Sequence, residues 1–158
     1  MKVSDILRVK GNTLYTASPD EPLSRALDLM SDRDIGSLVV MEHGDLVGML
    51  TFREIIQTLV KNGGSIGNTV VRSSMDHHPL TCTMETDMDE VRRMMLDRHA
   101  RYMPVMDHKM LMGVVSFYDV ARAVVDSQNF ENKMLKAYIR DWPEGEGEGE
   151  GEGQTKPV

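Results

Sequence analysis

The chain repeats itself, and this internal repeat constrains its fold more than any other feature. Shifting the sequence by 65 residues aligns residues 34–60 with residues 99–125 without a gap, and 7 of the 27 aligned pairs are identical. The stretches VGMLTFREI (residues 47–55) and MGVVSFYDV (residues 112–120) share a Gly, an apolar pair, a hydroxyl residue, a Phe and a carboxylate. Self-similarity at a fixed period predicts two copies of one supersecondary unit.

Both copies predict the same order of strands and helices. After a short first strand, apolar residues recur at the intervals of an amphipathic helix within residues 23–30, and approximately so within residues 88–95. Two short apolar runs separated by turn residues follow in each copy and predict a β-hairpin. Helical spacing then returns in residues 52–60 and 117–125. Each copy is therefore predicted to be a β-α-β-β-α unit.

One such unit is too small to be stable alone. A three-stranded sheet with two helices in about 60 residues leaves an apolar face uncovered. We therefore expect an α+β (α/β) fold in which two units pack about a pseudo-twofold axis, with grooves between them that suit small ligands. The expected boundaries are 1–62 for the first copy, 63–70 for a linker and 71–128 for the second copy. A C-terminal helix is expected at 129–142, and a disordered acidic Glu-Gly tail at 143–158.

Charge and cysteine content limit the class of protein. The formal net charge is −7, and the sequence suggests no basic patch of the kind that nucleic acid binding needs. Cys82 is the single cysteine, which excludes an internal disulfide and favours a reducing compartment. Because neither a signal peptide nor a run of about 18 apolar residues is apparent, we expect a cytoplasmic protein without membrane or nucleic acid partners.

The repeated hydroxyl and carboxylate have two interpretations. Thr51 and Glu54 in the first copy, like Ser116 and Asp119 in the second, lie three residues apart where a strand passes into a helix. This spacing is that of a capping box, in which both side chains bond the amides of the first turn. The same geometry suits a nucleotide, because a helix N-terminus attracts phosphate and a carboxylate can accept from ribose hydroxyls.

These paired motifs, with IGSLVV and RYMPVMD ahead of them, resemble the tandem CBS domain (cystathionine β-synthase domain) module over residues 2–125. The residues that follow resemble the end of stand-alone two-CBS proteins. The resemblance implies a non-catalytic regulatory module for signal transduction, often a homodimer. It also implies a ligand that contains adenosine, such as AMP, ADP, ATP, NAD or S-adenosylmethionine, bound between the repeats without a metal.

The resemblance also implies roles for residues of the second copy. Asp119 would accept hydrogen bonds from the ribose hydroxyls, and Ser116 would contact phosphate. Arg101, with Tyr102 beside it, would face phosphate. The segment that follows Thr81 would line the adenine through its backbone.

The first copy departs from the family pattern. It keeps Thr51, but Glu54 replaces the usual Asp and is one methylene longer, which suits a capping box better than a ribose contact. Gly36 and Ser37 stand where the second copy has an arginine and a tyrosine. Arg53 could still reach a phosphate, but a solvent-facing arginine on the helix is the preferred interpretation. We expect one competent nucleotide site in the second copy and one weakened or vacant site.

Two other functions remain as alternatives. The chain could be a protein-interaction adaptor with vestigial nucleotide sites, acting through its C-terminal apolar helix on a partner; some two-CBS proteins regulate thioredoxins. A metal-dependent hydrolase could use Asp76, His77 and His78, but adjacent His side chains in an extended segment point to opposite sides and rarely share a metal. We expect a polar linker there, with no catalytic residue and no metal site.

Overall fold

The computed structural model describes residues 1–11 and 13–140, and its elements repeat in order. The first copy contains α1 (Val3–Lys10), β1 (Thr16–Ala17), α2 (Leu23–Arg33), β2 (Ser37–Glu42), β3 (Asp45–Thr51) and α3 (Phe52–Lys61). The second contains α4 (Val71–Ser74), α5 (Met88–Arg98), β4 (Tyr102–Asp107), β5 (Met110–Ser116) and α6 (Phe117–Arg140). The predicted α+β class is confirmed.

The sheets of the two copies differ by one strand. In the first sheet β1 runs parallel to β2, and β3 runs antiparallel to β2. The second sheet is the hairpin β4–β5, and its counterpart of β1 is a single parallel bridge between Cys82 and Val105. The Cys82 N–H donates to the carbonyl of Pro104 at 3.0 Å. Pro104 stands where the first copy has Val39, and because proline has no N–H it cannot extend the ladder.

The copies also match in local backbone conformation. Both hairpins carry a bulge at corresponding places, between residues 40 and 41 and between residues 105 and 106. Helices α2 and α5 end at Asp34 (φ 51°) and His99 (φ 53°), which both adopt the left-handed conformation of a helix C-cap. The 65-residue period therefore extends from the sequence to the backbone.

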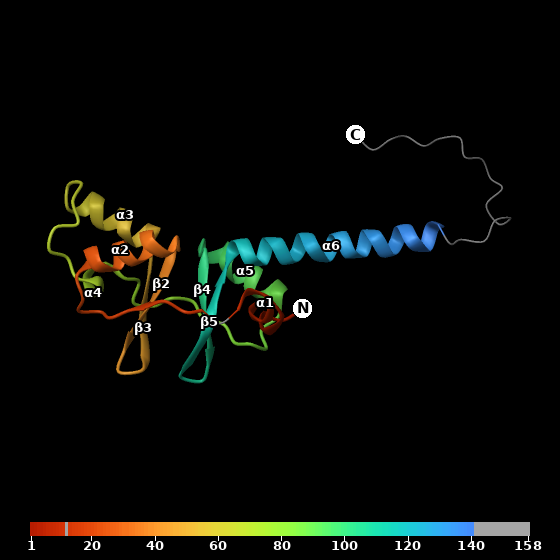
Figure 1. Ribbon diagram of the computed structural model, residues 1–158, viewed down its shortest axis with the longest axis horizontal. Helices are drawn as coiled ribbons and strands as arrows, with labels where there is room; N and C mark the ends of the chain where they lie inside the picture. Colours follow the sequence, from red (N-terminus) through yellow and green to blue (C-terminus); the bar gives the residue numbers. More distant parts are fainter. Residues whose placement is uncertain (12, 141–158) are drawn as a thin grey trace. The chain divides into compact units, whose positions relative to one another are not determined.

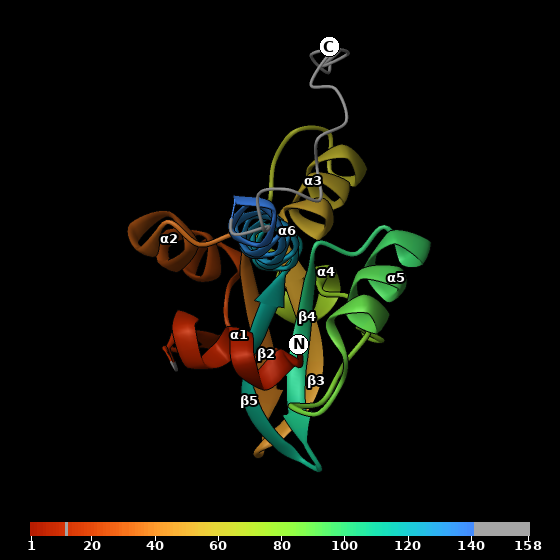
Figure 2. The same ribbon diagram turned by 90° about the vertical axis from the view of Figure 1, so that its right-hand side faces the viewer.

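Helix α1 belongs to the first copy in sequence but packs on the second. The Val3 N–H donates to the carbonyl of Thr86 at 3.0 Å, and the Ser4 N–H donates to that of Met84 at 3.0 Å. Val3 is fully buried, and α1 contacts β5. Figure 1 shows α1 with α5 beside the second hairpin, and Figure 2 shows it next to β5.

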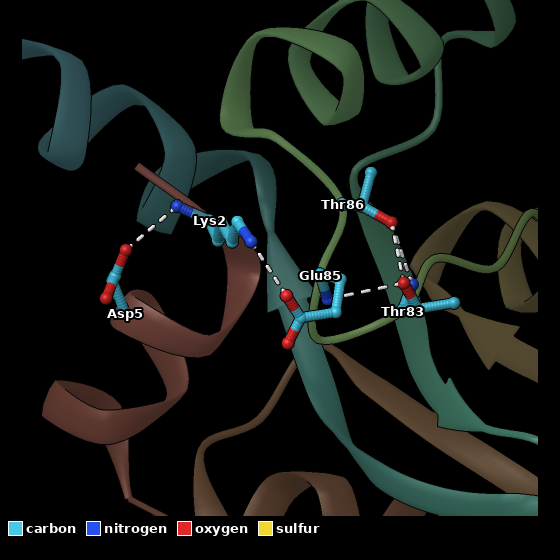
Figure 3. Close-up of polar contacts among 5 residues, drawn as sticks. All are labelled: Lys2, Asp5, Thr83, Glu85 and Thr86. Atoms are coloured by element: carbon cyan, nitrogen blue, oxygen red, sulfur yellow. Dashed lines mark hydrogen bonds and ion pairs between the residues drawn. The ribbon is translucent and has the colours of Figure 1, made fainter.

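Polar contacts hold the start of α1 against the turn that precedes α5 (Figure 3). The Lys2 ammonium lies 2.8 Å from a carboxylate oxygen of Glu85, and the Lys2 N–H donates to the Asp5 carboxylate at 2.9 Å. Within the turn, the Thr83 N–H donates to the Thr86 hydroxyl at 3.0 Å. Because Lys2 and Glu85 are exposed, solvent screens their ion pair. Apolar burial is therefore the main attachment of α1.

Helix α4 packs on the first copy in the corresponding way. The Leu23 N–H donates to the carbonyl of Thr69 at 2.8 Å, and the Val71 N–H donates to that of Glu21 at 3.0 Å. Val71 and Met75 are members of the apolar core of the first copy. Each copy therefore completes its core with the short helix that leads into the other copy, and we call α1 and α4 the leading helices.

The repeated glycine of β3 and β5 lets the leading helices approach. A Cβ at Gly48 would lie 2.6 Å from the Met75 sulfur and 2.7 Å from the backbone oxygen of Asp76. A Cβ at Gly113 would lie 3.0 Å from both methyl carbons of Leu7. A larger residue at Gly48 would push against the backbone that follows α4, and one at Gly113 would force the Leu7 side chain to shift. This close approach explains why both copies have glycine at this position.

Helix α6 is the longest helix of the described residues. It runs without interruption from Phe117 to Arg140, so residues 129–140 form its second part. Trp142 and the Glu-Gly tail lie outside the described residues. Residues 1–121 form one compact unit, and residues 122–140 belong to a separate unit. None of the helices within residues 1–11 and 13–140 has the length and apolarity that a membrane span requires.

Substituting the two glycines should have unequal effects. Gly48→Ala should lower the free energy of unfolding by about 2–3 kcal/mol, because its Cβ would meet a backbone carbonyl. Gly113→Ala should lower it by about 1 kcal/mol, because the Leu7 methyl groups can shift. Urea unfolding followed by circular dichroism measures both values. A larger loss for Gly113→Ala than for Gly48→Ala would contradict this account.

Candidate functional site

Two cavities lie between the copies. The larger, of about 940 Å³, is lined by residues 13–15 and 35–37 of the first copy and by residues 99–102 and 116–118 of the second. The smaller, of about 590 Å³, is lined by residues 51–54 of the first copy and by residues 78–80 and 98–102 of the second. Each cavity therefore holds one of the two hydroxyl residues of the repeated motif.

The crossing of the chain between copies decides which segments share a cavity. After α1 the chain crosses from the second hairpin to β1, and residues 11 and 13–15 line the larger cavity. After α4, residues 76–80 make the corresponding crossing, and most of them line the smaller cavity. The structure therefore does not bring Thr81 together with Ser116. Thr81 is exposed and lines neither cavity, and Thr13 is the hydroxyl residue that shares the larger cavity with Ser116.

Ser116 and Asp119 form a reciprocal capping box at the start of α6. The Ser116 N–H donates to Asp119 Oδ2 at 2.9 Å, and the Asp119 N–H donates to the Ser116 hydroxyl oxygen at 3.0 Å. Since the hydroxyl oxygen is an acceptor here, its hydrogen remains available to a ligand. Ser116 lines the larger cavity, whereas Asp119 lies one turn along the helix and is not part of the lining.

Lys10 is a further residue of this site, at the end of α1. Its ammonium lies 2.7 Å from Asp119 Oδ2 and donates to the carbonyl of Val114 at 3.0 Å. Lys10 also lines the larger cavity. Sequence reasoning missed it because no local pattern links two residues that are 109 positions apart. Only the packing of α1 on β5 brings them together.

Thr51 and Glu54 form the corresponding contacts at the start of α3. Glu54 Oε1 accepts from the Thr51 N–H at 3.1 Å and from the Thr51 hydroxyl at 2.7 Å. The backbone oxygen of Glu54 accepts from the Thr58 hydroxyl at 2.9 Å. Glu54 is 8% exposed, and burial raises its pKa above the ordinary value although the Thr51 hydrogen bonds oppose the shift. Unlike the Ser116 hydroxyl, the Thr51 hydroxyl donates its hydrogen to the carboxylate of the same motif, that of Glu54.

Arg53 and Arg101 lie where the two cavities meet. Both line both cavities, and the Arg53 guanidinium donates to the carbonyl of His99 at 2.6 Å. Within the described residues, neither guanidinium has a carboxylate at ion-pair distance. Tyr102 also lines both cavities, and its hydroxyl occupies the space that a Cβ at Gly36 would need. Two guanidinium groups that form no ion pair within the described part of the chain are therefore available to an anionic ligand.

The remaining candidate groups form no catalytic or metal-binding arrangement among the described residues, although Asp76 and His78 line the smaller cavity. Cys82 is buried, and burial raises its pKa to about 12, so it is a neutral thiol near neutral pH. Asp76 accepts from the His78 N–H at 2.9 Å, which is a turn contact. Among the described residues, no group of three or more His, Cys, Asp or Glu is placed to hold a metal ion.

Glu54→Gln should make stability less dependent on pH. Because the folded pKa of Glu54 is raised, the folded state keeps its proton to higher pH than the unfolded chain does. The contribution of Glu54 to stability should therefore decrease as pH rises from near 4 through the raised pKa. Urea unfolding between pH 4 and 8 should show the variant gaining stability relative to the wild type. A difference that stays constant over this range would refute the burial effect.

Comparisons with known proteins agree with this architecture. The chain is 31% identical over 147 residues to the mitochondrial CBS domain-containing protein CBSX3 of Arabidopsis thaliana, covering 87% of this chain and 71% of that protein. The structure of the CBS-domain containing protein ATU1752 from Agrobacterium tumefaciens superposes with a TM-score of 0.74 at 26% identity, covering 78% of this chain and 98% of that one.

Two similar structures contain ligands. The CBS domain pair of protein MJ0100, solved with 5-methylthioadenosine and S-adenosyl-L-methionine, has a TM-score of 0.69 at 25% identity and covers 78% of this chain and 99% of that one. CBSX2, solved with AMP, has a TM-score of 0.66 at 24% identity and covers 80% of this chain and 98% of that one. The family model of the CBS domain matches residues 3–61 and 70–126. This chain therefore belongs to the CBS domain family, and its two copies form a CBS domain pair.

Proposed function

We propose that this CBS domain pair is a non-catalytic regulatory module that binds an adenosine nucleotide in the larger cavity. The observation that carries the proposal is the placement of Ser116 and Asp119 at the start of α6, beside a cavity also lined by two arginines that form no ion pair with a carboxylate of the described residues. A helix N-terminus with a free hydroxyl hydrogen and nearby guanidinium groups suits phosphate.

The rest of the cavity suits a nucleoside. Leu14, Tyr15 and Ile35 supply apolar and aromatic surface for a purine ring. Asp119 is within one helical turn of the cavity, and a carboxylate can accept from both hydroxyls of a ribose. In this arrangement the ribose would lie at the start of α6, and the phosphate would lie toward Arg53 and Arg101.

Similar proteins support the adenosine class of ligand. MJ0100 is in complex with 5-methylthioadenosine and S-adenosyl-L-methionine, and CBSX2 is in complex with AMP. AMP, ADP, ATP, NAD and S-adenosylmethionine all contain the adenosine that the cavity would recognise. We place AMP first because the cationic residues of the lining match a phosphate.

We propose that the smaller cavity is the weaker site. The hydroxyl and the N–H of Thr51 both donate to Glu54 Oε1, so the capping box uses the groups that a nucleotide would need. Glu54 and Asp76 also add negative charge to the lining of this cavity. A phosphate would meet more repulsion here than in the larger cavity, whose described lining contains no carboxylate.

Binding of AMP should depend on Asp119. Isothermal titration should detect AMP binding to the wild type, and Asp119→Ala should weaken it by at least about tenfold, as expected for lost hydrogen bonds to a charged acceptor. Glu54→Gln is the matched control in the other copy and should leave this affinity unchanged. Absence of AMP, ADP, ATP, NAD and S-adenosylmethionine binding to the wild type would reject the proposed function.

One observation favours the adaptor function as a second candidate. The second part of α6 exposes large apolar side chains, including Phe130 (65% exposed), Met134 (59%) and Leu135 (57%). Such a surface suits a protein partner or a second copy of the chain. The homodimer and the cytoplasmic location stay predictions.

Self-association through α6 can be tested by sedimentation. If α6 forms a homodimer, the wild type should sediment with twice the chain mass, and Phe130→Glu with Leu135→Glu should produce a monomer, because buried charge opposes association. Lys133→Glu on the same helix is the control and should remain dimeric. A wild-type monomer at all concentrations would leave only an unlike partner for this surface.

A further inference from the structure

We infer that the Lys10 ammonium blocks ligand access to the Asp119 carboxylate. By doing so it would favour phosphorylated adenosine ligands over uncharged ones. This inference rests on the proposed nucleotide site. Its starting point is a contact between distant parts of the chain: the Lys10 ammonium lies 2.7 Å from Asp119 Oδ2. The lysine lines the larger cavity, whereas the aspartate does not. Lys10 therefore contacts both the cavity and the carboxylate that a ribose would need.

The acceptor capacity of Asp119 makes this position consequential. Oδ2 already accepts from the Ser116 N–H and from Lys10, which uses both of its lone-pair positions. A ribose that places one hydroxyl on each carboxylate oxygen needs acceptor capacity on Oδ2 as well as on Oδ1. The Asp119 side chain is 17% exposed, so little of it is open to a ligand while Lys10 is in place. The ribose must displace the Lys10 ammonium from Oδ2 before its two hydroxyls can bond to both oxygens of Asp119.

The charges of the cavity determine which ligand can displace it. A released Lys10 ammonium would enter a cavity that Arg53 and Arg101 already line, and the described lining contains no Asp or Glu. An uncharged nucleoside would leave these cations without a counter-ion. A phosphate on the ligand would offer the displaced ammonium a new partner and reduce the repulsion. The cationic sulfonium of S-adenosylmethionine would increase it.

The attachment of α1 limits the movement to the Lys10 side chain. Hydrogen bonds from Val3 and Ser4 tie the start of the helix to the turn before α5, and Lys2 reaches Glu85 in the same turn (Figure 3). The buried Leu7 packs against Gly113 one turn before Lys10. With its backbone held, Lys10 can exchange Asp119 for a phosphate only by rotating its flexible stem.

The test compares AMP with adenosine in wild type and Lys10→Met. Met keeps most of the unbranched stem and removes the ammonium. In the wild type, isothermal titration should show AMP binding at least about tenfold more tightly than adenosine. In Lys10→Met, adenosine should bind more tightly than to the wild type because Asp119 is free. AMP should bind more weakly, so the preference for AMP should fall about tenfold.

Lys61→Met is the matched control, because Lys61 ends α3 as Lys10 ends α1 but lines neither cavity. It should leave both affinities unchanged. Equal weakening of AMP and adenosine by Lys10→Met would overturn the inference and leave the nucleotide site standing. If neither protein binds either compound, the proposed function fails as well. Binding of adenosine to Lys10→Met but not to the wild type would support the inference that Lys10 blocks Asp119.

Discussion

The structure depends on the close approach of each leading helix to a strand of the other copy. Gly48 and Gly113 leave the space that Met75 and Leu7 occupy, and neither strand could accept a larger residue without displacement. This contact places α1 on the second copy and α4 on the first. The chain must then cross between copies after each leading helix, and these crossings form one wall of each cavity. The core and the candidate sites therefore have one geometric origin.

The same symmetric frame carries two chemically different sites. In the first copy a buried Glu54 accepts two hydrogen bonds from Thr51. The polar groups of this motif are therefore used to cap α3. In the second copy the shorter Asp119 leaves the Ser116 hydroxyl hydrogen available and forms an ion pair with Lys10. One methylene and one lysine thus separate a motif that caps its own helix from the motif that we propose binds a ligand.

The two arginines that line both cavities could link the proposed ligand binding to the arrangement of the copies. Arg53 comes from the first copy and Arg101 from the second, so a ligand that binds both would connect the copies. Such a ligand can transmit a signal only if it binds two arrangements of the copies with different affinity. A bound phosphate that also attracts Lys10 would change a contact between α1 and α6. This is a physical route from occupancy to structure.

The sequence by itself determined the repeat, the α+β class, the capping spacing and the cationic residues near the motifs, because these depend on local periodicity and on residue type. Thr51, Glu54, Ser116 and Asp119 could be found because their partners lie three residues away. Only the tertiary structure decided that Lys10 meets Asp119 and that Thr13 rather than Thr81 lies with Ser116. The physical reason is the exchange of leading helices between copies, which creates contacts across about a hundred residues that no local pattern encodes.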